Sequence, residues 1–213
     1  MDILPASIQK WYINLIQPII RLFIKYRLNP NWFTTLGLIV SSIAAYFFGA
    51  GHQHIGGALF LLAGTFDIID GKVARASGRV TKFGAIYDST LDRYAEMLVL
   101  FGIVYYYSRL SSFYLWGIDL ALVGGVSAAV ALGGSIMVSY VRARAEGVGL
   151  ECKVGIMQRP ERVVYLGFGA IFSKYTLIAA LIFIAIFSNL TAIQRLIHVR
   201  RQSMEDSMKN LTV

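Results

Sequence analysis

Six long apolar segments set the main constraint on how this 213-residue chain can fold. Each segment reaches or approaches the roughly 20 residues that an α-helix needs to cross a bilayer. The chain is 56% hydrophobic and has a mean hydropathy of +0.60, which is too apolar for a soluble domain of this size. The sequence therefore predicts an all-α integral membrane protein with six transmembrane helices. The predicted spans are residues 32–50, 55–70, 84–107, 113–140, 160–173 and 175–194.

An amphipathic segment precedes the first predicted span. Residues 6–26 carry apolar side chains three or four positions apart, with basic residues between them, which is typical of a helix lying in the membrane interface. Its apolar positions are Trp11, Leu15, Ile19, Leu22 and Phe23. We expect a single membrane domain over residues 1–213, with an interfacial helix at 6–26, a six-span bundle over 32–203 and a cytoplasmic tail at 204–213.

Basic residues are concentrated on one side of the predicted bundle. Short loops rich in Lys and Arg remain cytoplasmic, so both termini are expected on the cytoplasmic side of the cell (inner) membrane. The formal net charge of +8 then faces anionic headgroups or solutes, and nucleic acid is not expected as a partner. The residues on this side are Lys10, Arg21, Lys25, Arg27, Lys72, Arg75, Arg79, Lys82, Arg142, Arg144, Lys153, Arg159, Arg162, Arg195, Arg200, Arg201 and Lys209, and the other side has only Arg109 and Lys174.

Four aspartates lie among apolar residues of the second and third predicted spans. Asp67 and Asp70 are three positions apart and Asp88 and Asp92 four apart, so each pair projects from one face of a helix. An ionised carboxylate inside a bilayer costs at least a few kcal/mol, so such residues are usually paired, metal-bound or otherwise functional. Carboxylates without His or Cys partners suit Mg²⁺, Mn²⁺ or Ca²⁺, and these ions commonly hold phosphates.

Two other interpretations of the aspartates stay open at this point. They could pair with nearby cations, for which the candidates are Lys72, Arg75, Lys82 and Arg93. They could also form the cation or proton relay of a transporter, although such sites usually lie near the midplane between repeated halves and no repeat is visible. Asp67 lies about twelve residues into its span, roughly 18 Å from the outer end. This depth favours an enzyme that acts on a lipid headgroup.

The pattern Asp67-x-x-Asp70-Gly71-x-x-Ala74-Arg75, eight residues, then Gly84-x-x-x-Asp88-x-x-x-Asp92 resembles the signature of the CDP-alcohol phosphotransferases at all eight fixed positions. The resemblance implies that an alcohol displaces CMP from a CDP-linked lipid, at a site made mainly by the second and third spans. It also implies a homodimer.

The same resemblance assigns roles to individual residues. Two Mg²⁺ or Mn²⁺ ions would be held by Asp67, Asp70, Asp88 and Asp92. Asp92 would also be the general base that takes the proton of the attacking hydroxyl. The CDP-linked lipid would be bound by Pro30, Asn31, Thr34, Asp70, Gly71, Ala74, Arg75 and Gly84.

Basic residues beside this site suggest an anionic acceptor. The candidates for binding its phosphate are Arg142, Arg144, Arg162 and Arg195. The stretches "DSTLDR", "RARAEG" and "RPER" resemble the branch of the family that uses inositol phosphate, with CDP-diacylglycerol or its ether analogue as donor. Glycerol 3-phosphate and serine remain alternative acceptors, and the arginines could also serve topology alone.

Overall fold

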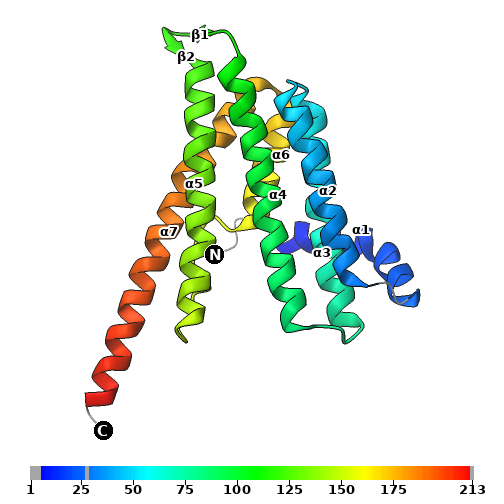
Figure 1. The fold of residues 1–213 in the computed structure, drawn as a ribbon, viewed down its shortest axis with the longest axis vertical. Coiled ribbons are helices and arrows are strands. Elements are labelled where there is room, and N and C mark those ends of the chain that lie inside the picture. Colours follow the sequence, from blue (N-terminus) through cyan, green and yellow to red (C-terminus); the bar gives the residue numbers. More distant parts are fainter. Residues whose placement is uncertain (1–5, 27–28, 212–213) are drawn as a thin grey trace.

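The computed structural model describes residues 6–26 and 29–211, which form seven helices and one short hairpin (Figure 1). This architecture agrees with the all-α fold expected from the sequence. The elements are α1 (Ala6–Lys25), α2 (Pro30–Gly49), α3 (Gln53–Ala76), α4 (Lys82–Arg109), β1 (Tyr114–Leu115), β2 (Ile118–Asp119), α5 (Leu120–Gly147), α6 (Arg159–Phe172) and α7 (Lys174–Leu211).

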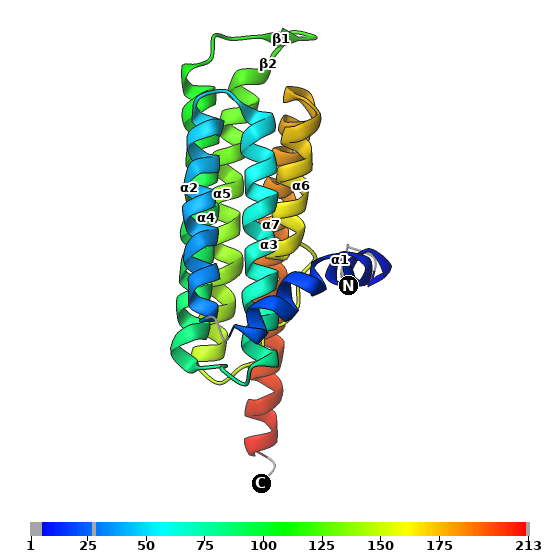
Figure 2. The ribbon, with the colours of Figure 1, turned by 90° about the vertical axis from the view of Figure 1, so that its right-hand side faces the viewer.

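The long helices α2 to α5 and α7 run side by side along the long axis of the molecule (Figures 1 and 2). The hairpin β1–β2 caps one end, the α3–α4 turn lies at the other, and α1 lies across the bundle. The main core includes Phe48, Phe60, Ile103 and Leu181, all at most 2% exposed. A Cβ on Gly102 would lie 2.3 Å from the Ala45 carbonyl oxygen, so α4 and α2 pack at backbone distance.

Three helical segments are long and apolar enough to cross a membrane within the described residues: Asn31–Gly49, Leu120–Gly147 and Lys174–Glu205. The predicted fifth span corresponds to α6, which has 14 residues. At 1.5 Å per residue it is about 21 Å long, short of the ~30 Å hydrocarbon core. The structure thus supports a membrane protein, and the count of six spans stays a prediction.

The predicted fourth span begins too early. Residues 113–140 were expected to be helical, but β1 and β2 pair antiparallel over 114–119 and α5 starts only at Leu120. Trp116 and Gly117 form the turn with positive φ angles of 50° and 79°. The Asp119 side chain then accepts from the Ala121 amide at 2.9 Å, which caps the start of α5.

The C-terminal helix contains both the last predicted span, 175–194, and most of the predicted tail at 204–213, because α7 continues to Leu211. Residues 195–211 contain no Gly or Pro, so nothing in this stretch breaks the helix. The C-terminal part of α7 therefore extends beyond the other helices of the bundle (Figure 2).

Helix α1 packs on the bundle through one of its apolar faces. Ile16 and Ile20 join a second core cluster with Phe33, Ile69 and Val73. Other apolar residues of α1 stay exposed: Leu15, Ile19 and Leu22. The side chain of Trp11 lies outside the described residues, and the interfacial position of α1 stays a prediction.

Candidate active site

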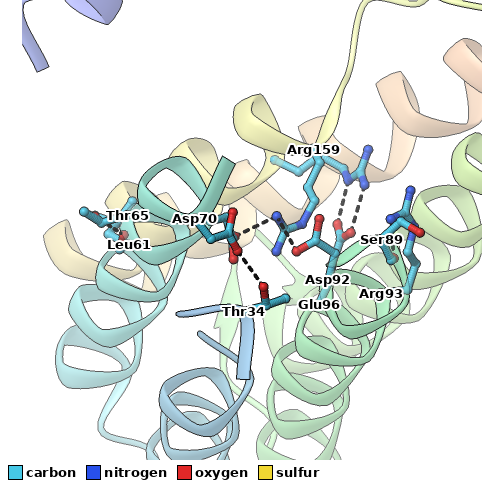
Figure 3. Close-up of polar contacts among 11 residues, drawn as sticks. Thr34, Leu61, Thr65, Asp70, Ser89, Asp92, Arg93, Glu96 and Arg159 are labelled. Carbon is cyan, nitrogen blue, oxygen red and sulfur yellow. Dashed lines mark hydrogen bonds and ion pairs between the residues drawn. The ribbon is translucent and has the colours of Figure 1, made fainter. Parts of the chain in front are cut away.

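The four aspartates lie near the end of the bundle that carries the α3–α4 turn. Asp67 and Asp70 belong to the second half of α3, and Asp88 and Asp92 to the first three turns of α4. Helix α2 packs against both α3 and α4, while α6 packs against α3. Asp70 is buried and the other three are half-buried. Figure 3 shows Asp70 of α3 and Asp92 of α4 in one region of the bundle.

Residues at the start of α2 hold the site together. The Thr34 hydroxyl donates to Asp70 Oδ2 at 2.8 Å in a buried contact (Figure 3). Thr35 Oγ1 lies 2.9 Å from the Tyr87 hydroxyl of α4. Thr34, expected to border the nucleotide, therefore also orients one of the proposed metal ligands.

Glycines create close approaches around the acids. A Cβ on Gly37 would lie 3.1 Å from Asp67 Oδ1, so this position of α2 leaves room for the carboxylate. Sequence reasoning missed Gly37, because it lies in another span than the motif. A Cβ on Gly84 would lie 3.6 Å from Asn31 Oδ1, which places two of the expected donor-binding residues side by side.

The remaining expected donor-binding residues lie on α3 and at the start of α2. A Cβ on Gly71 would come 3.3 Å from Arg75 Nη2, so the arginine side chain folds over the glycine on α3. Ala74 lies between them along the chain and is half-buried. Pro30 is the first residue of α2, and its side chain lies outside the described residues.

Arg159, the first residue of α6, reaches into the aspartate cluster. Its Nη1 donates to Asp67 Oδ2 at 2.7 Å and forms an ion pair with Asp92 Oδ1 at 2.9 Å (Figure 3). These contacts join α6 to α3 and α4. Sequence reasoning missed this role, because no local spacing links residue 159 to residues 67 and 92.

Glu96 extends the acidic face of α4 by one more turn. It lies four positions after Asp92, as Asp92 lies four after Asp88. Its carboxylate binds Arg162 of α6 with both oxygens, accepting from Nε at 2.6 Å and from Nη2 at 2.8 Å. Sequence reasoning missed Glu96, although the repeated spacing of four was a signal that could have found it.

The four arginines expected to bind the acceptor phosphate have different environments. Arg162 is 3% exposed and its third contact is to the Met157 carbonyl at 3.3 Å. Arg195 is also buried, and its Nε donates to the Val154 carbonyl at 2.8 Å.

The other two arginines of this set lie near the end of α5. Arg142 forms an ion pair with Glu146 at 2.8 Å and its side chain is 43% exposed, while Arg144 is exposed. Arg195 lies close enough to Arg142 and Arg162 for their charges to interact. The structure thus brings three of the four into one region and leaves Arg142 the most accessible of these three.

The acids fit a hard divalent cation by their chemistry. Asp88 Oδ1 and Asp92 Oδ1 are buried oxygens without a hydrogen bond, so they can still accept a donor or bind a cation. Among the described residues, no three acidic, His or Cys side chains are arranged to hold one ion as they stand.

The cations first considered as partners of the acids do not pair with them. Lys72, Arg75 and Lys82 form no salt bridge with the four aspartates within the described part of the chain. Arg93 donates instead to the Ser89 carbonyl of its own helix. Arg159 is the cation that contacts the cluster, so simple pairing with neighbours in sequence does not explain the motif.

Two named phospholipid synthases are similar to this chain in sequence. It is 34% identical over 202 residues to the archaetidylinositol phosphate synthase of Methanothermobacter thermautotrophicus, covering 91% of this chain and 96% of the relative. It is 36% identical over 163 residues to the phosphatidylinositol phosphate synthase of Mycobacteroides abscessus, covering 76% and 70%.

Solved structures share its fold. The phosphatidylinositol phosphate synthase of Mycobacterium tuberculosis with CDP-DAG bound matches with a TM-score of 0.73 and 30% identity, covering 87% of this chain and 94% of that one. The same enzyme in complex with manganese and citrate matches with a TM-score of 0.74 and 29% identity, covering 85% and 87%.

The family model of the CDP-alcohol phosphatidyltransferases matches residues 27–200. This range includes all eight positions of the aspartate motif and the four arginines expected to bind the acceptor phosphate: Arg142, Arg144, Arg162 and Arg195. Together with the relatives and the shared fold, the match extends the sequence resemblance to nearly the whole chain. The protein therefore belongs to the CDP-alcohol phosphatidyltransferase family.

Proposed function

We propose that this enzyme transfers a phosphatidyl group from a CDP-linked lipid to a hydroxyl of inositol phosphate and releases CMP. The observation that carries the proposal is the complete aspartate motif on two helices, with a buried set of carboxylate oxygens. The names of the relatives support inositol phosphate as the acceptor. One relative is named for an archaetidyl lipid and the other for a phosphatidyl lipid, so the donor is proposed only as a CDP-linked lipid.

Reaction at this site forms one bond and breaks another. The acceptor hydroxyl oxygen attacks the lipid-side phosphorus, and the bond from that phosphorus to the bridging oxygen breaks, so that CMP leaves. Asp92 takes the proton of the hydroxyl on its carboxylate. Thr34 keeps Asp70 oriented through its 2.8 Å hydrogen bond. Asn31 and Gly84 line the approach of the nucleotide.

A divalent cation would be held by Asp67, Asp70, Asp88 and Asp92. When bound, Mg²⁺ or Mn²⁺ would supply positive charge that offsets the negative charge of the donor's pyrophosphate. The manganese complex of a structural relative supports this choice of ion. We propose two ions. One Mg²⁺ that also binds phosphate oxygens and water usually takes only one or two carboxylates, and this site has four.

Acceptor binding is assigned to the arginines at the cytoplasmic end. Arg142 is the most direct candidate for contact with the phosphate, because its side chain is accessible and its salt bridge to Glu146 is exposed and easily exchanged. Arg162 and Arg195 border the same region, and Arg144 extends it along α5. Their positive charge attracts a phosphate monoester in preference to an uncharged polyol.

The distribution of basic residues between the two ends of the bundle suggests how the protein is oriented in the membrane. We propose that α2 to α7 make up six membrane passages, with α1 in the interface and both termini cytoplasmic. The hairpin end carries only Arg109 and Lys174 among the basic residues of the described chain, which supports this orientation. We further propose that the enzyme works as a homodimer, as the family resemblance implies.

Aspartate-to-asparagine variants test the proposed roles. Asp67→Asn, Asp70→Asn and Asp88→Asn are expected to abolish CMP release through loss of metal. Asp92→Asn should retain donor binding while kcat falls by ~10² or more, the usual contribution of a general base.

Asp119→Asn is the matched control, because it makes the same chemical change at the far end of the bundle and asparagine also caps helices well. The measurements are CDP-lipid binding and CMP release with added Mn²⁺. Full turnover by any of the three metal-ligand variants, or weakened donor binding with normal kcat in Asp92→Asn, would contradict these roles.

A further inference from the structure

Arg159 contacts two acids that belong to different helices of the proposed metal site. Its Nη1 lies 2.7 Å from Asp67 Oδ2 and 2.9 Å from Asp92 Oδ1, and its side chain is 22% exposed. A guanidinium stays charged at every physiological pH. Two of the four carboxylates are therefore partly neutralised by a cation that is tethered to α6.

The two contacts differ in quality. The contact with Asp67 is a hydrogen bond, whereas Asp92 Oδ1 forms an ion pair without hydrogen-bond geometry. Arg159 Nε is also buried without a hydrogen-bond partner. A buried donor without an acceptor is costly, so the guanidinium is not held in its best possible environment. It can leave the acids at a lower cost than a fully bonded arginine such as Arg162.

A divalent cation needs the same oxygens. Mg²⁺ and Mn²⁺ bind carboxylate oxygens directly, and the described residues offer no ready arrangement of three acidic ligands. For Asp67 and Asp92 to turn towards an ion, their contacts with Arg159 must break or be shared. The positive charge of the guanidinium also repels a cation that binds beside it.

We propose that Arg159 is a positioning residue that competes with the divalent cation for Asp67 and Asp92 and thereby sets the metal affinity of the site. This inference rests on the proposed metal site, and it adds a residue outside the aspartate motif. Removing the guanidinium should tighten metal binding, because the carboxylates are freed. A residue that merely supports the site would have the opposite effect, because its loss would scatter the ligands and weaken binding.

The test measures Mn²⁺ binding to the full-length protein in detergent micelles, by the electron paramagnetic resonance signal of free Mn²⁺, without lipid substrate. Arg159→Gln is expected to bind Mn²⁺ about tenfold more tightly than wild type, since one charge-assisted hydrogen bond and one nearby positive charge are removed. Arg159→Lys keeps the charge and loses the planar fork, so it should give an intermediate affinity. It also serves as the second variant if Arg159→Gln does not fold.

Arg93→Gln is the matched control for charge alone. Arg93 lies next to Asp92 in sequence, but its guanidinium donates to the Ser89 carbonyl, and within the described residues it forms no salt bridge with any of the four aspartates. The proposal is supported if Arg159→Gln tightens binding much more than Arg93→Gln does.

Three outcomes would overturn the proposal. Equal or weaker binding by folded Arg159→Gln would show that Arg159 does not compete with the metal. Equal tightening in Arg93→Gln would show a general charge effect. Absence of Mn²⁺ binding in wild type and all variants would overturn the proposed metal site as well, which separates that failure from the failure of this inference alone.

Discussion

Replacing Glu96 by Leu leaves the Arg162 guanidinium buried without its carboxylate. Glu96 is 6% and Arg162 3% exposed, and two hydrogen bonds of 2.6 and 2.8 Å join them. Breaking a buried pair from one side typically costs ~3–5 kcal/mol. At about 2–4 °C per kcal/mol for a chain of this size, the Tm should fall by roughly 6–20 °C.

The double variant Glu96→Leu with Arg162→Met provides the control for this prediction. It removes both charges and fills the space with apolar side chains, a change that is often neutral or stabilising. Its Tm, measured by thermal unfolding in detergent, should therefore lie well above those of Glu96→Leu and Arg162→Met. The reasoning is refuted if the single variants lose less than about 2 °C, or if the double variant loses as much as the two singles together.

Three further predictions concern packing, the acceptor and the free thiol. Gly102→Ala should cost about 1–3 kcal/mol of unfolding free energy, because its Cβ would lie 2.3 Å from the Ala45 carbonyl oxygen, whereas Gly133→Ala in open space should not lower the Tm. Arg142→Ala should raise the acceptor KM by roughly ten- to a hundredfold with the donor KM nearly unchanged, and steady-state kinetics with Arg142→Lys should show only partial rescue. Burial raises the pKa of the Cys152 thiol, so at neutral pH less of it is thiolate than for an exposed cysteine, and maleimide should label it slowly in the folded protein and quickly in SDS. Equal labelling rates would contradict the burial of this loop.

Helix periodicity and apolar length were enough to predict much of the fold. The segments at 32–50, 55–70 and 84–107 correspond to α2, α3 and α4, because long apolar helices leave a strong local pattern. The hairpin over 114–119 was missed, since its tyrosine, leucine, tryptophan and isoleucine look as apolar as a span. The turn at Trp116 and Gly117, with positive φ angles, and the cap formed by Asp119 separate it from the helix that follows.

The candidate site also contains residues that local spacing could predict and one that it could not. The spacing of Asp67, Asp70, Asp88 and Asp92 within two helices was sufficient to predict that their side chains share one region. Arg159 could not be found this way, because its ion pair with Asp67 joins residues 92 positions apart and depends on how α6 packs against α3.

The identity of the acceptor is the central claim, and CMP release tests it most directly. Purified protein with CDP-diacylglycerol and Mn²⁺ would be given inositol phosphate, glycerol 3-phosphate, serine or free inositol in parallel reactions. We expect inositol phosphate to give the highest kcat/KM and a lipid product that retains the acceptor's phosphate. Faster CMP release with free inositol or glycerol 3-phosphate, or no CMP release with any acceptor, would contradict the account.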